Sequence, residues 1–442
     1  MDDLRSSKAK FEKMTYYRPP LILEPTRLQD ALGVIELSDL PDPEPSNKMR
    51  LKNATPLIER LWRIALSDVE SNIVRLPDGS TYFGAGTGFG AQVYTRDISY
   101  SGILSLNRLY AGIMRQSLEH TRRVRLRLGF TVSRAHKVDG IEVNWAVEDI
   151  SEEEFLAKYR TNSYTRRTDD VVWLWCAGNL FERYGSPDDW RWLYETGREC
   201  FQRLYDPFFD PEDGLYKGQA SFIDIHYEDT KATGYPSEWT ISDCVHIKAT
   251  STNCLYVKGL EIIGVAARKF GLADEAASWA SRARSLKEAI RRELRFEDGT
   301  FAYFKDRSGR LEDRRDALGT ALAVLLEVVT GEEAVQALRD YPVTDAGVSL
   351  FHPFYPVDNW YHNNSSWPFV DTLFLMASEK ADGRDRIPLN LALLARVCRD
   401  GTFHEVVDLR NKEVRGSGGQ LWTAAAFLGT CMRAGFELGR RS

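Results

Sequence analysis

Hydrophobic positions along the chain recur mainly every three or four residues, which is the pattern of amphipathic helices. Ser186 and the glycines Gly185 and Gly271 lie where helix caps are expected. The pattern therefore predicts a mainly helical protein. The predicted helices cover, approximately, residues 55–70, 101–118, 169–184, 188–205, 251–270, 273–294, 316–330, 332–340, 366–380, 388–399 and 418–438.

Strand-like segments are short and lie between these helices. Residues 128–147 alternate in polarity and contain turn residues, and residues 299–305 follow a Glu-Asp-Gly turn. Both predict hairpins inserted at one end of a helical body. Residues 1–50 differ, because prolines are frequent and periodic apolar positions are few. We expect an extended N-terminal arm over residues 1–50 and a catalytic body over residues 51–442.

The unit of helix, loop and helix recurs roughly six times along this body. Six antiparallel helix pairs can close into a ring with an inner layer, an outer layer and one funnel-shaped end. The predicted fold class is therefore all-α, an (α/α)6 toroid with short β-hairpin insertions and an extended N-terminal arm.

Charge and hydropathy exclude several classes of partner. The chain has 442 residues and a net charge of −6, from 64 acidic and 58 basic residues. Such a balance gives no general attraction to nucleic acid or to an anionic membrane. No segment approaches the ~20 apolar residues that span a bilayer, and the first residues lack the apolar core of a secretory signal. We expect a cytoplasmic protein, while a signal peptide removed earlier would leave the same pattern; the oligomeric state is not predicted.

The sequence carries no pattern typical of a metal or cofactor site. Six scattered cysteines form no CxxC pair, which favours reduced, mostly buried thiols. Seven histidines show no HxxxH or HExxH spacing, and no GxSxG elbow occurs. The glycines of residues 84–90 do not belong to a βαβ unit, as a dinucleotide fingerprint would require. We therefore expect no metal and no cofactor.

Aromatic and charged residues gather in five loops between the predicted helices. Aromatic rings offer flat faces to a pyranose, and carboxylate and guanidinium groups can hold neighbouring hydroxyls. For Arg96 and Asp97 the alternative role is capping of the following helix, and for the tryptophans it is core or rim packing. The candidate substrate-binding residues are Tyr94, Arg96, Asp97, Tyr235, Glu238, Trp239, Trp360, Tyr361, His362, Trp367, Gln420 and Trp422.

Two acidic residues in these loops have the surroundings of catalytic carboxyl groups. Asp224 ends an apolar run, where desolvation would raise its pKa toward that of a general acid. Glu405 lies in a short apolar segment, which a polar turn and the glycine-rich residues 416–419 follow. A solvated loop acid and an exposed strand-edge charge are the respective alternatives.

Taken together, the segments YTRDISYSG, GQASFIDI, YPSEW, STNCLYVKGLEI, YHNNSSWPFVDTLFLMA, FHEVVD and GSGGQLWTAAAFL resemble the six-hairpin glycosidases over roughly residues 60–440. This superfamily includes glycogen-debranching glucosidases, trehalases, processing α-glucosidases, mannosylglycerate hydrolases and α-rhamnosidases. The resemblance implies an (α/α)6 barrel with the site at the funnel mouth and an inverting hydrolysis. It further implies that Asp224 is the general acid, that Glu405 is the general base, and that Arg96 and Asp97 belong to a sugar subsite.

The sequence thus predicts an inverting, exo-acting hydrolase of a small or terminal, α-linked glycoside, with a small carbohydrate as its partner. Two other classes of enzyme remain open. A sugar epimerase or isomerase would use funnel histidines, for which His226, His246, His362 and His404 are candidates. A phosphorylase would replace water by phosphate and need a basic cluster, for which Lys217, Lys231 and Lys248 are candidates.

Overall fold

The computed structural model describes residues 21–91, 94–128, 132–138, 141–148, 168–223, 234–239, 243–244 and 246–440, with the backbone alone over 124–148 and at 440. This part of the chain is predominantly helical and contains no closed sheet. The prediction of a mainly helical protein is therefore confirmed.

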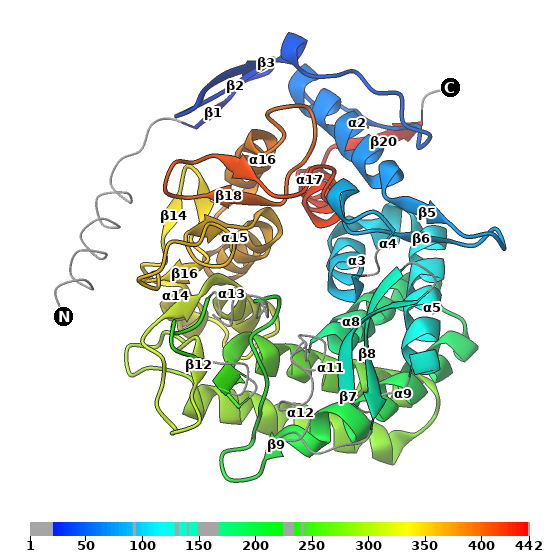
Figure 1. Cartoon of the computed structure of the whole chain (residues 1–442), viewed down its shortest axis with the longest axis vertical. Helices are drawn as coiled ribbons and strands as arrows, with labels where there is room; N and C mark the ends of the chain where they lie inside the picture. Colours follow the sequence, from blue (N-terminus) through cyan, green and yellow to red (C-terminus); the bar gives the residue numbers. More distant parts are fainter. Residues whose placement is uncertain are drawn as a thin grey trace.

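Six helices contact one another in a closed circuit within the described residues. In chain order each packs against the next, and the last returns to the first. Figure 1 shows them following one another around the centre of the molecule. They are α3 (Thr95–Ser101), α8 (Asp169–Tyr184), α11 (Thr250–Lys269), α13 (Ala317–Leu325), α15 (Pro368–Asp382) and α17 (Leu421–Arg433).

Further helices pack on the outside of this circuit: α2 on α17, α9 and α12 on α11, and α14 on α13 and α15. The two layers differ in burial. Most positions of α11 are buried, polar Thr252 and Asn253 included, whereas α12 buries only one face. The outer helices are α2 (Pro56–Ser71), α5 (Ala111–Leu128), α9 (Pro187–Cys200), α12 (Ala273–Glu293), α14 (Glu332–Leu338) and α16 (Ile387–Arg396).

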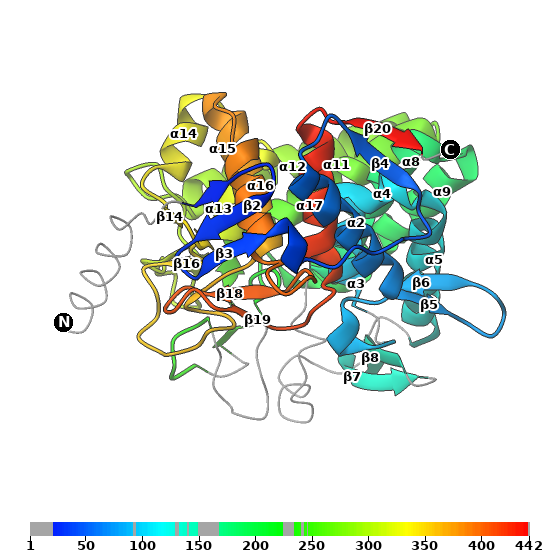
Figure 2. The same cartoon turned by 90° about the horizontal axis from the view of Figure 1, so that it is seen from above.

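Short strands connect the helices. Figure 2 places β7 (Val132–Val138), β8 (Ile141–Glu148), β18 (Val406–Asp408) and β19 (Val414–Arg415) at one end of the helical layer. The hairpin β7–β8 occurs where residues 128–147 predicted one. β18 lies between β19 and β17 (Ser365–Ser366). The remaining pairs are β5 (Ile73–Arg75) with β6 (Thr81–Phe83), β9 (Phe209–Asp210) with β10 (Leu215–Tyr216), β11 (Lys248–Ala249) with β12 (Phe304–Lys305), β13 (Arg315–Asp316) with β16 (Phe351–His352), and β14 (Val343–Thr344) with β15 (Gly347–Val348).

The described part of the predicted N-terminal arm contains regular structure. β1 (Ile22–Leu23), β2 (Arg27–Asp30) and β3 (Gly33–Glu36) form an antiparallel sheet. β2 packs against α16, and β4 (Met49–Lys52) pairs with β20 (Glu437–Arg440) near the other end of the chain. Residues 21–52 are thus joined to the helical body by packing and by backbone hydrogen bonds.

A buried ion pair also joins this region to the helical body. The Asp30 carboxylate accepts a 2.9 Å hydrogen bond from Arg396 Nε and also contacts Arg399, and the Asp30 side chain is fully buried. We expect Asp30→Ala to lower the free energy of unfolding by about 3–5 kcal/mol, because it leaves a buried guanidinium without its carboxylate. Urea unfolding would measure this loss. Glu24→Ala, which removes an exposed ion pair with Arg27, is the control and should change stability by less than about 1 kcal/mol.

Two helices begin or end at residues other than those predicted from the sequence. The segment predicted over 101–118 is interrupted by a π-helical turn at Gly102–Leu106, so α3 ends before it and α5 begins after it. The segment predicted over 418–438 is helical only over Leu421–Arg433, because Gly419 has a positive φ of 56° and residues 437–440 pair as a strand.

The six cysteines are all buried and unpaired by disulfides, as the sequence predicts. A search of the described residues finds no group of three or more His, Cys, Asp or Glu side chains that could hold a metal ion. No helix in the same part of the chain combines the length and apolar character needed to cross a membrane.

Candidate active site

Glu405 is a buried carboxylate with two defined hydrogen-bond donors. It immediately precedes β18 and is 3% exposed. The Tyr361 hydroxyl donates to Oε1 at 2.7 Å, and the Ser417 backbone N–H donates to Oε2 at 3.0 Å. Both donors favour the ionised carboxylate. The two bonds fix the orientation of its oxygens, as a general base that holds a water molecule requires.

A glycine allows the second of these bonds. A Cβ atom at Gly416 would lie 2.5 Å from Glu405 Oε2, and the φ of Gly416 is +80°. Only glycine fits both conditions, because a side chain would collide with the carboxylate and would be strained at that φ. The glycine-rich turn noted in the sequence therefore brings a backbone N–H onto Glu405.

The second glycine-rich segment, residues 84–90, packs on the same loop. Thr87 N and Oγ1 both donate to the Gly418 carbonyl, at 3.1 and 2.7 Å, and Gly88 N donates to Ser417 Oγ at 3.0 Å. Gly86 and Gly88 allow this close approach, because a Cβ atom at either position would lie 3.0 Å or less from Ser417 Oγ.

Aromatic side chains form a continuous cluster from Glu405 toward the Asp224 segment. The ring of Tyr361 lies 4.9 Å from that of Trp367, which lies 5.2 Å from that of Phe222. His362 stacks on Trp367 at 5.6 Å. Phe222 precedes Asp224 by two residues, so the structure brings the two predicted catalytic segments to one aromatic cluster.

Trp422 and Gln420 close another side of this cluster. Trp422 stacks on Phe369 with ring centroids 4.1 Å apart and meets Trp367 edge-on at 5.7 Å. With its amide oriented to satisfy both neighbours, Gln420 donates to the Ala85 carbonyl and accepts from Trp422 Nε1. Trp360 lies beside Tyr361 and under the Arg415 guanidinium.

Asp224 itself lies outside the described residues, but the backbone that leads to it is firmly held. At the start of α11, Asn253 Oδ1 accepts from Tyr216 N at 2.8 Å, and Thr252 Oγ1 donates to the Gln219 carbonyl at 2.5 Å. The Ile223 carbonyl accepts from Gln219 Nε2 at 2.6 Å and from the Tyr235 hydroxyl at 3.3 Å. These bonds fix the backbone position of Ile223, the residue that precedes Asp224.

Phe222 is the strained point of this segment, since it has a positive φ of 59°. A bulky residue in the left-handed region costs of order 1–3 kcal/mol and persists only where its surroundings impose it. The fully packed ring of Phe222 and the hydrogen bonds on either side provide that constraint.

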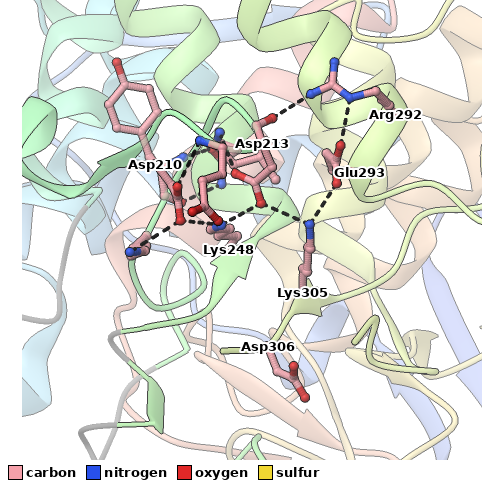
Figure 3. A network of polar contacts seen from close by, with 12 residues as sticks. Asp210, Asp213, Lys248, Arg292, Glu293, Lys305 and Asp306 are labelled. Carbon is pink, nitrogen blue, oxygen red and sulfur yellow. Dashed lines mark hydrogen bonds and ion pairs between the residues drawn. The ribbon is translucent and has the colours of Figure 1, made fainter. Parts of the chain in front are cut away.

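A network of charged side chains anchors the preceding hairpin, β9–β10, as Figure 3 shows. Lys248 Nζ contacts Asp210 at 2.9 Å and Asp213 at 2.5 Å. Lys305 Nζ joins Asp213 to Glu293 at 3.0 and 2.8 Å. The network ties the hairpin to β11, β12 and the end of α12. It therefore also orients the chain that continues to Ile223.

Tyr235 and Trp239 form a neighbouring group. Their rings stack at 6.4 Å, and the ring of Trp239 lies 5.1 Å from that of Phe304. Tyr235 is buried and uses its hydroxyl on the backbone of residues 220 and 223, so its observed contacts are structural. Glu238 is exposed, and its carboxylate accepts a hydrogen bond from the Ser237 hydroxyl.

The predicted sugar subsite lies at the start of α3. Arg96 is buried and its Nε is 2.8 Å from Asp169 Oδ1, and Asp97 is buried in the first helical turn. The Tyr94 ring lies 5.2 Å from that of Phe89, a residue of the 84–90 segment. The substrate-binding roles of these three residues stay predictions.

Two residues of the site were missed from the sequence. Ser417 contributes a backbone N–H, which no side-chain pattern can reveal. Asp68 lies on α2 and accepts from Phe403 N at 2.7 Å, two residues before Glu405. Its place on a predicted amphipathic helix gave no sign of this contact.

The chain is similar in fold to several solved structures. No protein-family model and no curated protein matches the sequence. A metal-independent α-mannosidase from Streptococcus pneumoniae, solved with α-1,6-mannobiose, superposes with a TM-score of 0.56 and 16% identity over 86% of this chain and 94% of that chain. The neutral trehalase Nth1 of Saccharomyces cerevisiae has a TM-score of 0.56 and 14% identity over 81% of this chain and 75% of that chain.

A GH78 rhamnosidase from Bacillus sp. GL1 gives a TM-score of 0.58 at 13% identity, over 90% of this chain but only 36% of that chain. The chain has the fold of these glycosidases. The superpositions agree with the predicted mainly helical architecture and, at identities of 13–16%, they show a shared fold.

Proposed function

We propose that this protein is an inverting, exo-acting glycoside hydrolase, in which Asp224 protonates the leaving oxygen and Glu405 activates a water molecule. The circuit of α3, α8, α11, α13, α15 and α17 is then the inner layer of an (α/α)6 toroid. Its substrate is a small or terminal, α-linked glycoside. The observation that carries the proposal is the buried Glu405 carboxylate, joined by Tyr361, Trp367 and Phe222 to the segment that ends at Asp224.

Inversion needs an acid on one face of the sugar and a base on the other, with carboxyl groups ~6.5–9.5 Å apart so that a water molecule fits between them. Tyr361 and Ser417 each donate to one oxygen of Glu405 and so orient the carboxylate. The aromatic rings beside it offer stacking faces to a pyranose. These are the requirements of a base in a sugar site.

The contacts in the described residues give less support to the other two classes of enzyme. Lys248 and Lys217, named for a phosphate site, contact the carboxylates of Asp210 and Asp213. His404 contacts Asp400 at the surface, and His362 is stacked against Trp367. Lys231 and His226 lie outside the described residues.

The activity can be tested with a panel of aryl and natural α- and β-linked disaccharides and terminal glycosides, each incubated with and without inorganic phosphate. The proposal expects release of free sugar from an α-linked member at a rate independent of phosphate. Phosphate-dependent release of a sugar phosphate would contradict it, as would epimerisation without cleavage.

The hydrogen bond from Tyr361 to Glu405 is expected to contribute to kcat. Tyr361→Phe keeps the ring in the cluster but removes a hydrogen bond to a carboxylate, which is worth about 1.5–3 kcal/mol. We expect kcat to fall at least 10-fold with a smaller change in KM. Tyr110→Phe, which removes a 3.3 Å bond to Glu70 away from the site, is the matched control and should retain kcat. Equal kcat values for the two variants would show that Tyr361 does not support Glu405.

A further inference from the structure

The end of α2 contacts both chain segments that flank Glu405. Asp68 Oδ2 accepts from Phe403 N at 2.7 Å, and Asp68 Oδ1 accepts from Thr402 Oγ1 at 3.1 Å. The same Thr402 hydroxyl oxygen accepts from Gly419 N at 2.7 Å. One carboxylate thus holds the segment before Glu405 directly and the 416–419 loop through a single hydroxyl.

A second connection runs through Asn72. Its Nδ2 donates to the Asp68 carbonyl at 2.8 Å and to the Gly419 carbonyl at 2.6 Å. The C-terminal end of α2 is therefore linked to Gly419 by two routes, directly through Asn72 and indirectly from Asp68 through Thr402. That loop includes Ser417, whose N–H donates to Glu405.

We infer that Asp68 is a positioning residue for Glu405, which keeps the 402–405 segment and the 416–419 loop in the register that gives the carboxylate its two donors. The inference rests on the proposed role of Glu405 as the base. It assigns no contact between Asp68 and substrate.

Asp68 holds these segments most strongly when it is ionised, because hydrogen bonds to a carboxylate are stronger than those to a protonated carboxyl group. Burial raises the pKa of Asp68 from 3.8 to about 6, against the opposing effects of the Phe403 and Thr402 bonds and of His404. The titratable groups that act on it are His404 and Asp400, both on the adjoining segment, where burial and the Asp68 carboxylate in turn raise the pKa of the Cys398 thiol. Asp68 is thus ionised at neutral pH and becomes protonated as the pH falls through about 6.

Protonation of Asp68 also makes the free energy of unfolding depend on pH. The folded pKa lies above the ordinary value, so the folded state binds this proton more tightly than the unfolded state. The contribution of Asp68 to the free energy of unfolding is complete below the ordinary pKa and is lost as the pH rises to about 6. Activity should show the reverse trend, because the ionised form holds both segments more strongly.

The experiment compares Asp68→Asn with the wild type in kcat and KM from pH 5 to pH 8. At pH 8 we expect kcat to be about 10–100-fold lower in the variant with a nearly unchanged KM, as a small displacement of a catalytic group would give. The ratio should shrink toward 1 at pH 5, where the wild type also carries a protonated Asp68. Asp78→Asn, in an exposed turn, makes the same chemical change and should leave the profile unaltered.

Hydrogen exchange gives a readout independent of turnover. The amides of Phe403, Ser417 and Gly419 should exchange faster in Asp68→Asn than in the wild type or Asp78→Asn. Thr402→Val, which removes only the hydroxyl link, should accelerate Gly419 and serves if Asp68→Asn does not fold. A pH-independent ratio of kcat values, or unaltered exchange at these amides, would overturn the inference.

The outcome separates this inference from the proposed function. If Glu405→Gln abolishes turnover while Asp68→Asn retains it, the base assignment stands and the positioning role fails. If Glu405→Gln retains turnover, the base assignment fails, and the positioning role of Asp68 fails with it, whatever the exchange rates.

Discussion

Glutamine in place of Glu405 is expected to lower kcat by about 10²–10⁴-fold, because an amide cannot take the proton from the attacking water. Glutamine has the size of glutamate and still accepts one of the two hydrogen bonds from Tyr361 and Ser417. The fold should therefore survive, with a melting temperature near that of the wild type. Substrate binding should change little, since the base acts in the transition state.

Steady-state kinetics with the substrate identified from the glycoside panel measures this loss. Glu333→Gln, on the outer helix α14 and paired with Arg295, is the control for a glutamate lost elsewhere. Turnover of Glu405→Gln within a few-fold of the wild type would remove Glu405 from the mechanism. Unfolding of the variant would be detected by circular dichroism before any kinetic value is interpreted.

Asparagine in place of Asp224 is expected to reduce kcat by about 10²–10⁴-fold on a natural glycoside, whose leaving group needs a proton. The loss should be much smaller on an aryl glycoside with an acidic phenol, because that leaving group departs without protonation. Glu405→Gln should instead lose activity on both substrates alike, since both need an activated water.

Kinetics of the two variants on both substrates would test this division of roles. Asp298→Asn, in a turn that the Thr300 amide and hydroxyl contact, is the control for an aspartate outside the site. An equal loss for Asp224→Asn on the aryl and the natural glycoside would contradict its role as the acid. For Glu405→Gln, by contrast, an equal loss on the two substrates is the result expected of a general base.

Local patterns in the sequence were sufficient to predict most of the helices. Ser186 caps α9 with a reciprocal contact to Asp189, as the sequence suggests, and α2, α8, α11, α12 and α15 lie within two residues of their predicted limits. The π-helical turn after α3 was not predicted, because it begins at Gly102, where a Cβ atom would collide with Cys176 Sγ, a contact that the local sequence does not reveal. The pairing of β20 with β4 joins residues almost 400 apart and leaves no local pattern.

The sequence allowed the residues of the candidate site to be predicted where their chemical type indicated a role. The aromatic and acidic loops pointed to Glu405, Tyr361, Trp367 and Trp422, and the structure brings these four to one cluster. The sequence could not show that Tyr361 donates to Glu405, that Ser417 offers its backbone N–H, or that Asp68 holds Phe403. Each of these depends on distances between segments far apart in the chain.

The most direct test of the two-carboxylate account is the anomeric form of the first sugar released. Proton NMR during the first minutes of hydrolysis, before mutarotation, would distinguish the two anomers. The account predicts a product of opposite configuration to the substrate, because water attacks from the face opposite the leaving group. A product that retains the configuration of the substrate would contradict it.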